Sequence, residues 1–578
     1  MVEDSITRRR VSKTGAHAAT SPRHEQAPLE GMVPWPADVA ARYVARGYWR
    51  GVTIGEVFDE TARRCAAREA VIDGERRVTF AELSRMVDRL ALHFAARGIC
   101  GNRRVICQLH NSLECVVAYL ACLKVGAIPL ACLPAHRHRE IGHLARFTDA
   151  HAWLIPDEYR GFDHVAMAQE LRGELPQMRE IVVAGSQTAA GMTLFSDLLA
   201  DPIEERESAG SLARVRPRPE APALFQLSGG STGLPKVIPR THNDYLYNSL
   251  IGGPSAGYDG NSTALVAIPM MHNFPLPFAV QAAMVLGGKL VVTSNTDPEN
   301  IFNLIERERV TWTCAVPAMV VNWLAHPRLK RTDFSSLRSL AVGGSRLNPE
   351  PARRVLQEIG PVVTQIYGMA EGLCCCSRQG DPEEVLLETQ GRPVSEADEI
   401  RIIDENGADV PPGELGELIA RGPYTIRGYY KAPEHNRNSF TPDGYYRTGD
   451  VVRLHPSGNL VVEGRSKDLI NRGGEKISAE EIENLILTHP TVSNAAVVAM
   501  PDPVMGERSC AYVTLAPGSQ LDLKGLAGFL ENQRIARFKL PERLEVIERF
   551  PMTAVGKISK KDLREDIKRK LERERLPA

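Results

Sequence analysis

The sequence predicts an α/β protein with at least two domains, and three observations support this. The 578 residues exceed what one hydrophobic core usually supports. From Val52 to about Val215, runs with helical periodicity alternate with short apolar runs, the pattern of an α/β sheet, and the chain beyond continues it. Between Glu399 and Asp450, short strands split by turns instead predict a small antiparallel barrel or sheet.

The elements follow from local periodicity in chain order. After a polar leader, residues 33–51 combine tryptophan, proline and an amphipathic run, which predicts a docked N-terminal strap and ordered structure from about Pro28. A helix is expected over 80–98, and a helix followed by a buried strand over 110–134. Further buried strands are expected at 103–110, 287–295 and 336–345.

The glycine-rich, charged stretch 464–478 indicates a hinge or domain boundary. After it, helical runs alternate with strands, and the chain from Lys560 onward predicts a charged, solvated helix. We therefore divide the sequence into a disordered leader (1–27), a large domain (28–466) and a small C-terminal domain (467–578).

The composition excludes several classes of protein. Hydrophobic content of 43% and charged content of 24% are those of an ordinary soluble globular protein. Seventy basic and 71 acidic residues provide no global field for a nucleic acid. The leader lacks the apolar centre of a signal peptide and no run of 18 apolar residues follows, so we expect a cytoplasmic protein without a membrane partner.

Eleven cysteines are scattered along the chain apart from the run Cys374, Cys375 and Cys376. Without paired CxxC motifs, they are interpreted as reduced thiols. Neighbouring residues of a regular element point in different directions, which favours apolar packing over a three-cysteine metal site.

The segment 226–240, QLSGGSTGLPKVIPR, predicts a phosphate-binding loop. Its glycines let the backbone approach a ligand closely, its hydroxyl and amide groups donate hydrogen bonds, and Lys236 adds a positive charge. No hydroxyl residue follows Lys236, which disfavours the Walker P-loop GxxxxGK[ST]. A nucleoside triphosphate is the expected ligand.

Four further strings follow this loop in a fixed order: IYGMAEG (366–372), YRTGD (446–450), GRSKD (464–468) and PMTAVGK (551–557). Together they resemble the adenylate-forming ligases, a superfamily of acyl- and aryl-CoA synthetases, peptide-synthetase adenylation domains and luciferases. The resemblance covers nearly the whole chain. It implies a large N-terminal domain of two βα-layered subdomains plus a small β-barrel, and a small mobile α+β C-terminal domain.

Adenylation requires in-line attack of a carboxylate on the α-phosphorus of ATP while charge accumulates and pyrophosphate leaves. The resemblance implies that Thr232 and Glu371 bind Mg²⁺ through the phosphates, since this cation takes one or two carboxylates there. Lys557 would reach the carboxylate and the α-phosphate. The residues expected to hold the phosphates are Ser228, Gly229, Gly230, Ser231, Thr232, Gly233 and Lys236.

The same resemblance implies which residues bind the nucleoside and which accommodate the thiol acceptor. Asp450, with Arg465 beside it, would accept hydrogen bonds from the ribose diol. Adenine would be flanked by Gly343, Gly344 and Ser345 and stacked on Tyr367, next to Gly368. Lys467 occupies the hinge position. Rotation there would remove Lys557 from the site and bring in a loop formed by Arg472, Gly473 and Gly474, whose glycines leave room for a pantetheine arm.

The thiol acceptor has two alternatives, free CoA or the phosphopantetheine of a carrier-protein domain, because both present the same group. CoA would need a basic patch for its 3′-phosphate. Arg537, Lys539 and Lys560 are candidates for such a patch, and solvated surface residues are the alternative interpretation.

The string MHNFPLPF (271–278) resembles the aryl branch that activates salicylate and 2,3-dihydroxybenzoate. The resemblance implies that Asn273, a neutral amide, binds the 2-hydroxyl of the ring. Phe278 stands where that branch carries a small polar residue, and Cys374, Cys375 and Cys376 replace bulkier residues. The aryl-acid pocket is expected to comprise His272, Asn273, Phe274, Phe278, Gly343 and Cys374.

These departures predict a salicylate-like acid or a larger hydroxyaryl acid such as a hydroxynaphthoate, activated in secondary-metabolite biosynthesis. One alternative is a 2,3-dihydroxybenzoate or salicylate ligase that loads a carrier protein for siderophore assembly. A luciferase-like oxygenase is disfavoured because an aryl carboxyl carbon has no α-hydrogen. A non-catalytic nucleotide-binding protein is disfavoured because Lys557, Glu371 and Asp450 are all present.

Overall fold

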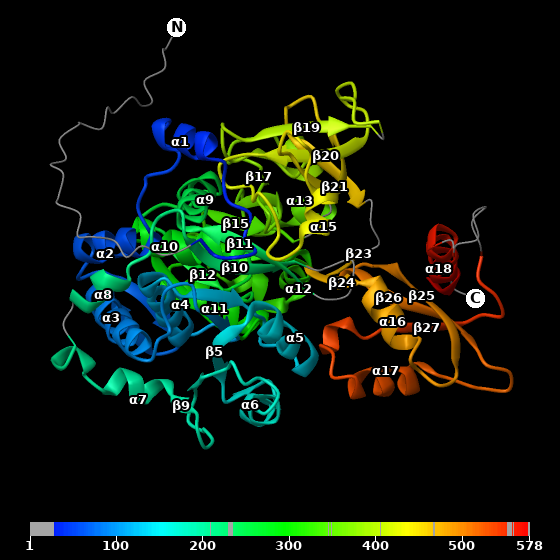
Figure 1. Ribbon diagram of the computed structural model, residues 1–578. Helices are drawn as coiled ribbons and strands as arrows, with labels where there is room; N and C mark the ends of the chain where they lie inside the picture. Colours follow the sequence, from blue (N-terminus) through cyan, green and yellow to red (C-terminus); the bar gives the residue numbers. More distant parts are fainter. Residues whose placement is uncertain are drawn as a thin grey trace, which may run out of the picture.

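The computed structural model describes residues 28–207, 210–228, 235–344, 346–347, 349–404, 406–465, 469–551, 558 and 560–575. The fold is mixed α/β, with a large N-terminal domain and a small C-terminal domain that lies to one side of it (Figure 1). The leader at 1–27 and the hinge residue Lys467 lie outside the described residues.

The first sheet of the large domain runs in the order β11-β10-β4-β3-β5-β8-β9 and is parallel except for the antiparallel pair β10 and β11. Its strands are β3 (Arg104–Cys107), β4 (Ile128–Ala131), β5 (Ala150–Pro156), β8 (Glu180–Ala184), β9 (Thr193–Leu194), β10 (Pro222–Ser228) and β11 (Lys236–Thr241). The accompanying helices are α3 (Phe80–Ala96), α4 (Leu113–Val125), α5 (His138–Thr148), α6 (His164–Arg172), α7 (Phe195–Ala200) and α8 (Gly210–Val215). Short β6 (Glu158–Tyr159) and β7 (Phe162–Asp163) form a separate hairpin.

The second sheet runs in the order β18-β17-β16-β15-β14-β12-β13-β1-β2, with a parallel centre and antiparallel edges. Its strands are β1 (Glu69–Asp73), β2 (Arg76–Thr79), β12 (Thr263–Val266), β13 (Lys289–Val292), β14 (Trp312–Ala315), β15 (Ser339–Val342), β16 (Val363–Gly368), β17 (Cys374–Cys376) and β18 (Arg392–Pro393). Its helices include α9 (His242–Ser255), α10 (Gln281–Leu286), α11 (Pro298–Glu308), α12 (Pro317–Ala325), α13 (Pro349–Glu358) and α14 (Glu383–Glu388). Strand β1 thus pairs with β13, which comes much later in the chain, and β2 pairs with β1 at the edge of the sheet.

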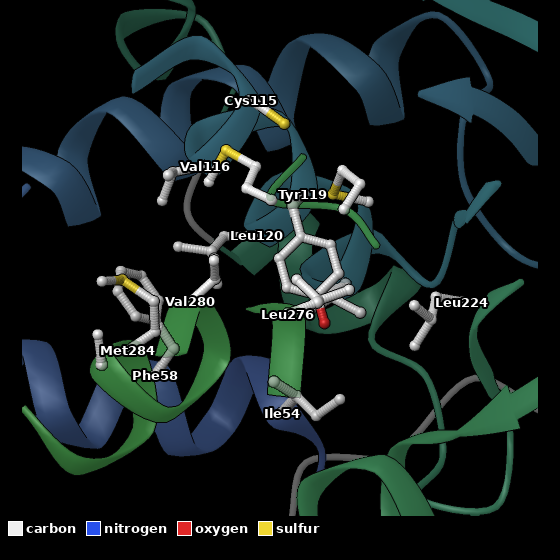
Figure 2. Packing of buried hydrophobic residues seen from close by; sticks show 14 of the residues in the cluster. Ile54, Phe58, Cys115, Val116, Tyr119, Leu120, Leu224, Leu276, Val280 and Met284 are labelled. Atoms are coloured by element: carbon white, nitrogen blue, oxygen red, sulfur yellow. The ribbon is translucent and has the colours of Figure 1, made fainter. Parts of the chain in front are cut away.

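Helix α4 lies in the core between the two sheets. Its N-cap is Ser112, whose hydroxyl accepts the Cys115 amide at 3.3 Å, and its C-cap is Gly126, whose φ of 68° suits a residue without Cβ. Nearly every side chain of α4 is buried, as expected for a helix without a polar face. Figure 2 shows Tyr119 and Leu120 packing near Leu276 and Val280, and this contact ties the two sheets together.

The region that follows Glu399 forms the predicted antiparallel unit, in the order β19-β20-β21-β22. Its strands are β19 (Glu399–Ile403), β20 (Gly416–Arg421), β21 (Tyr446–Leu454) and β22 (Leu460–Arg465), with α15 (Pro433–Ser439) between β20 and β21. The N-terminal strap, which contains α1 (Ala37–Ala45) and precedes α2 (Ile54–Arg64), docks as expected: the Trp49 indole N–H donates to the Pro423 carbonyl at 2.9 Å. Trp35 packs edge-on against Trp49 at 5.0 Å.

The small domain combines a sheet with α16 (Ala479–Ile486), α17 (Leu523–Asn532) and α18 (Lys560–Arg575). Its strands are β23 (Leu469–Arg472), β24 (Glu475–Ser478), β25 (Val492–Asp502), β26 (Gly506–Leu515) and β27 (Arg543–Val546). The stretch interpreted as a hinge or domain boundary contains the β23–β24 hairpin, whose turn residues Gly473 and Gly474 both have positive φ. Two glycines between apolar runs are the local signal for such a turn.

The last helix differs from its prediction as a solvated element. One face of α18 is charged, but Leu563 and Ile567 are buried against Tyr512 and neighbouring strand residues. These two apolar residues are four apart and therefore share a face. Among the described residues, no helix combines the length and apolar character needed to span a bilayer.

Candidate active site

One cavity of about 1520 Å³ collects the predicted motifs at the junction of the two domains. Ser228 ends β10, Gly344 follows β15, and Tyr367 and Gly368 end β16, so the site lies at the carboxyl ends of these strands, where open α/β sheets bind ligands. The predicted residues that line it are Ser228, Lys236, His272, Asn273, Phe274, Phe278, Gly344, Tyr367, Gly368, Glu371, Cys374, Asp450 and Gly474.

Several predicted residues cannot be placed in this cavity because they lie outside the described residues. They are Gly229, Gly230, Ser231, Thr232, Gly233, Ser345, Lys467 and Lys557. Two described residues that flank the first five, Ser228 and Lys236, pair with each other across β10 and β11 and line the cavity.

Lys236 stands at one end of the phosphate loop and contacts residues that follow β20. Its Nζ atom forms a short hydrogen bond with Nε2 of His435 and lies 5.0 Å from the ring centre of Tyr429. The hydroxyl of Ser439 lies 3.0 Å from the same His435 nitrogen. Packing against an aromatic face and a histidine holds the lysine at the cavity wall.

Glu371 is buried and held by tyrosines. The Tyr429 hydroxyl donates to Oε1 at 2.7 Å and lies 3.0 Å from the Tyr446 hydroxyl. The second carboxylate oxygen, Oε2, has no hydrogen-bond partner among the described residues. A buried carboxylate at the wall of a cavity, with one oxygen oriented by a hydrogen bond, suits a hard cation.

Asp450 lies in β21, opposite Arg465 of β22 in the backbone register. The Tyr367 hydroxyl donates to Asp450 Oδ2 at 2.7 Å, and the Asp450 amide donates to the Thr448 hydroxyl at 3.1 Å. The residue expected to stack on adenine therefore also fixes the carboxylate expected to bind the ribose. Gly344, with φ of 87°, adopts the left-handed conformation that favours glycine.

The amide of Asn273 is fixed by partners on two sides. Its Nδ2 group donates to the Met369 carbonyl at 3.2 Å, and its Oδ1 atom accepts from the Tyr245 hydroxyl at 3.3 Å. Because a carbonyl can only accept, the first contact determines which amide atom is the nitrogen. Burial raises the pKa of Tyr245, so this residue acts as a neutral donor. The neighbouring His272 ring accepts the Phe274 amide at 3.3 Å.

Phe278 lies in a π-helical segment, η2 (Leu276–Val280), that the sequence patterns did not predict. Such segments are frequent at functional sites. The Phe278 ring packs against Gly252 of α9, where an added Cβ would lie 3.2 Å from it. Gly252 thus accommodates part of the bulk that this position adds to the pocket wall. Similarly, a Cβ on Gly343 would lie 3.2 Å from the ring of Phe274.

The three adjacent cysteines alternate between the two faces of β17. Cys374 and Cys376 belong to the main core of the large domain, whereas Cys375 packs with Leu418 and Val452 of the antiparallel sheet. Burial raises the pKa of the Cys374 thiol, which keeps it protonated at the cavity. All eleven cysteines lie within the described residues and are free thiols.

The three residues expected to form the loop beside the pantetheine arm have different surroundings. Gly474 lines the cavity and approaches Val316 and Gly344 of the large domain. Gly473 packs against Met505. The Arg472 guanidinium forms two hydrogen bonds with the Glu542 carboxylate, at 2.9 and 3.0 Å, within the small domain.

The candidates for a CoA phosphate patch are also unlike one another. The Arg537 side chain is 84% exposed. Lys560 pairs with Glu483 at 2.7 Å. Lys539, expected at the surface as either a phosphate ligand or a solvated residue, is instead buried with only 5% exposure and paired with carboxylates.

Tyr429, His435 and Tyr446 were not among the residues predicted for the site. The structure places all three in the cavity wall beside Lys236 and Glu371. The first two belong to the string RGYYKAPEHN, which contributed to the aryl-branch resemblance. Two adjacent tyrosines and a histidine within residues 429–435 were the available signal.

Comparison with known families identifies two matching regions. A family described as AMP-binding enzyme matches residues 58–430. A second, described as AMP-binding enzyme C-terminal domain, matches residues 481–557. The matches fall on the large and the small domain respectively.

Similar proteins match along most of their length. The chain is 46% identical to a salicylyl-CoA synthase / salicylate adenylyltransferase from a Streptomyces species, over 94% of this chain and 98% of the relative. It is 44% identical to a 2,3-dihydroxybenzoate-AMP ligase from Bacillus subtilis, over 94% and 99%. It is 45% identical to a 2-hydroxy-7-methoxy-5-methyl-1-naphthoate–CoA ligase from Streptomyces carzinostaticus, over 92% and 96%.

Solved structures support the same fold. The apo structure of MbtA from Mycobacterium smegmatis is 42% identical, with a TM-score of 0.70 over 93% of this chain and 98% of that one. The amide bond synthetase McbA from Marinactinospora thermotolerans is 26% identical, with a TM-score of 0.80 over 89% and 100%.

Proposed function

Because the chain belongs to the AMP-binding enzyme family and to its aryl acid–AMP ligase branch, we propose that it activates a hydroxyaryl carboxylic acid with ATP. The products of the first step are an aryl adenylate and pyrophosphate. A second step transfers the aroyl group from the adenylate to a pantetheine thiol, which forms a thioester and releases AMP. We also propose that the chain divides into a large domain (28–466) and a small C-terminal domain (467–578).

The observation that carries this proposal is the convergence of Lys236, Asn273, Glu371 and Asp450 on one cavity. Lys236 and the loop that precedes it hold the phosphates of ATP. Asp450, oriented by Tyr367, accepts the ribose hydroxyls. Asn273 presents its amide to the ring substituent next to the carboxyl group. The acid and the α-phosphorus are thereby held in one site, which replaces a bimolecular encounter by a positioned attack.

Glu371 and Thr232 would hold Mg²⁺ through the phosphates. The place of Glu371 at the cavity wall and the hydrogen bond that fixes its Oε1 atom fit this role. When bound, the ion neutralises charge on the departing pyrophosphate. Lys557 would contact the attacking carboxylate and the α-phosphate in the first step, and movement about Lys467 would exchange it for the Gly473–Gly474 turn in the second.

The acid we propose is a salicylate-like or larger hydroxyaryl acid. The Asn273 amide is neutral, which suits a hydroxyl and not the ammonium of an amino acid. Phe278 offers no hydroxyl partner at the ring position that distinguishes 2,3-dihydroxybenzoate, while Cys374 and Gly252 leave room. Relatives named for salicylate and for a substituted naphthoate show similar identity, and so does one named for 2,3-dihydroxybenzoate, which remains the alternative substrate.

The acceptor is CoA or a phosphopantetheinylated carrier protein. Lys539 is buried and paired, so Arg537 is the better candidate for contact with a CoA 3′-phosphate. A product assay with CoA alone separates the two acceptors: formation of aryl-CoA supports free CoA, and accumulation of aryl adenylate without it supports a carrier protein.

Competition between salicylate and 2-hydroxy-1-naphthoate in ATP–pyrophosphate exchange tests the substrate class. We expect acid-dependent exchange with both acids and a higher kcat/KM for the naphthoate. Exchange with salicylate and none with the naphthoate would exclude the bicyclic acid. Oxygen uptake coupled to ATP consumption would instead favour the luciferase-like alternative.

Replacing Gly252 with alanine tests whether α9 sets the size of the pocket. The added methyl group would lie 3.2 Å from the Phe278 ring and push the ring towards the cavity. We expect the kcat/KM ratio of 2-hydroxy-1-naphthoate to salicylate to fall about tenfold, the typical effect of one methylene in a pocket. Gly528→Ala, where an added Cβ meets nothing within 4 Å, is the matched control. An unchanged ratio in Gly252→Ala would remove this role.

A further inference from the structure

A buried ion pair crosses the seam between the two domains. Lys539, in η4 (Arg537–Lys539) of the small domain, places its Nζ atom 3.2 Å from Glu140 Oε1 in α5 of the large domain. The same ammonium group lies 2.9 and 3.1 Å from the Glu481 carboxylate in α16. The exposed fractions are 5% for Lys539, 0% for Glu140 and 3% for Glu481. Figure 1 shows α5 on the side of the large domain that faces the small domain.

The Lys539 ammonium group and the Glu140 carboxylate stabilise each other's charged forms, whereas burial raises the pKa of Glu481 despite its contact with Lys539. Burial alone would lower the pKa of Lys539, but the carboxylates of Glu140 and Glu481 outweigh it and raise the pKa. Burial would raise the pKa of Glu140, yet Lys539 and the neighbouring donors hold it below its ordinary value. Burial lowers the pKa of the adjacent His136 to about 4, so that ring is neutral at pH 7. Lys539 is therefore the cation on which Glu140 depends across the seam.

The two arms of this cluster have different consequences for domain movement. The Lys539–Glu481 arm lies within the small domain and travels with it. The Lys539–Glu140 arm exists only in the present orientation, as does the Ala536 amide that donates to Glu140 Oε1 at 3.4 Å. Rotation of the small domain would leave the Glu140 carboxylate without either donor. Rotation would exchange these charge-assisted hydrogen bonds for contacts with water, so this arm favours the present orientation by their net free energy.

The orientation that the ion pair favours is the one with the β23–β24 hairpin at the cavity. On the same seam, the Asn471 side chain donates to the Gly344 carbonyl at 2.8 Å. An added Cβ on Gly474 would lie 3.0 Å from Val316 of the large domain. The cavity itself reaches the ion pair, since Lys539, Glu481 and Gly474 all line it. The hairpin contact and the ion pair therefore belong to one interface.

We propose that Glu140 and Lys539 are positioning residues for the thiol-transfer step, because their buried ion pair holds the small domain in the orientation that brings Gly474 to the active-site cavity. This inference rests on the proposed two-step function. Neither residue is required to touch the acid or ATP. Loss of the pair should therefore slow transfer and leave adenylation intact.

Glu140→Gln is the sharpest variant because it removes only the arm that crosses the seam. The glutamine carbonyl can still accept the Arg137 amide, which bonds Glu140 Oε2 at 3.0 Å at the start of α5, so the helix keeps its cap. The Lys539–Glu481 pair stays intact. The matched control is Glu170→Gln, since Glu170 pairs across the same seam with Arg534 at 3.2 Å but both side chains are more than half exposed. Exposed pairs contribute little.

Two rates are measured in the full-length protein with salicylate or 2-hydroxy-1-naphthoate. The first is ATP–pyrophosphate exchange. The second is single-turnover transfer from preformed aryl adenylate to pantetheine, the thiol arm that both acceptors share. In Glu140→Gln we expect the ratio of transfer to exchange to fall about tenfold, within the range of conformational couplings. Glu170→Gln should match the wild type, and melting temperatures should agree among all three proteins.

Hydrogen exchange provides a readout that a purely structural role for Glu140 would not move. Faster exchange confined to residues 534–540 and 469–478 supports the inference, because these two segments contact the large domain, at Glu140 and at Gly344 respectively, in the present orientation. Equal transfer rates in wild type and Glu140→Gln would overturn it, as would parallel loss of both half-reactions. A wild-type protein that exchanges pyrophosphate but never transfers would contradict the proposed second step, a result distinct from either of these.

Discussion

Replacing Glu371 with glutamine is expected to lower the rate of aryl adenylate formation by about 100- to 1000-fold. Glutamine keeps the size of the side chain and can accept from Tyr429, but it removes the charge that we assign to Mg²⁺ binding. The effect should be measured as ATP–pyrophosphate exchange over a range of Mg²⁺ concentrations. Near wild-type exchange at all of them would contradict the assignment.

Tyr429→Phe distinguishes the effect of the Glu371 charge from the effect of the hydrogen bond that orients it. This variant keeps Glu371 and removes the hydroxyl that donates to Oε1. Loss of a partner that orients a metal ligand typically weakens metal affinity about 10- to 100-fold. We therefore expect exchange to recover at high Mg²⁺ in Tyr429→Phe and not in Glu371→Gln.

Replacing Lys557 with alanine is expected to lower adenylate formation by about 100- to 1000-fold, because one positive charge at the attacking carboxylate and the α-phosphate is lost. Folding should be unaffected, as judged by the melting temperature. Transfer from preformed aryl adenylate to pantetheine should be retained, since the proposed rotation removes Lys557 from the site in that step. Lys568→Ala, on the exposed face of α18, is the control. Retained exchange in Lys557→Ala would remove the assignment.

Local elements were predictable because their signals are local. The helix expected over 80–98 is α3, which begins at the Thr79–Glu82 capping box. The helix and strand expected over 110–134 are α4 and β4. The motifs also indicated which segments meet, since Lys236, Asn273, Glu371 and Asp450 all line one cavity.

Features that depend on distant partners could not be predicted in the same way. Nothing in the pattern of 69–79 shows that β1 pairs with β13, more than 200 residues later. Lys539 has the sequence context of a surface lysine, and its partners Glu481 and Glu140 lie 58 and 399 residues away. The space that the Phe278 ring occupies depends likewise on Gly252, which belongs to another helix. Burial of a charge or a ring is decided by the fold as a whole.

The most direct test of the proposed reaction is acid-dependent ATP–pyrophosphate exchange by the full-length protein. We predict exchange that requires Mg²⁺ and an ortho-hydroxyaryl acid, with salicylate or 2-hydroxy-1-naphthoate active and benzoate much weaker, because only the first two offer a hydroxyl to Asn273. Absence of exchange with every ortho-hydroxyaryl acid, in protein shown to be folded, would contradict the account.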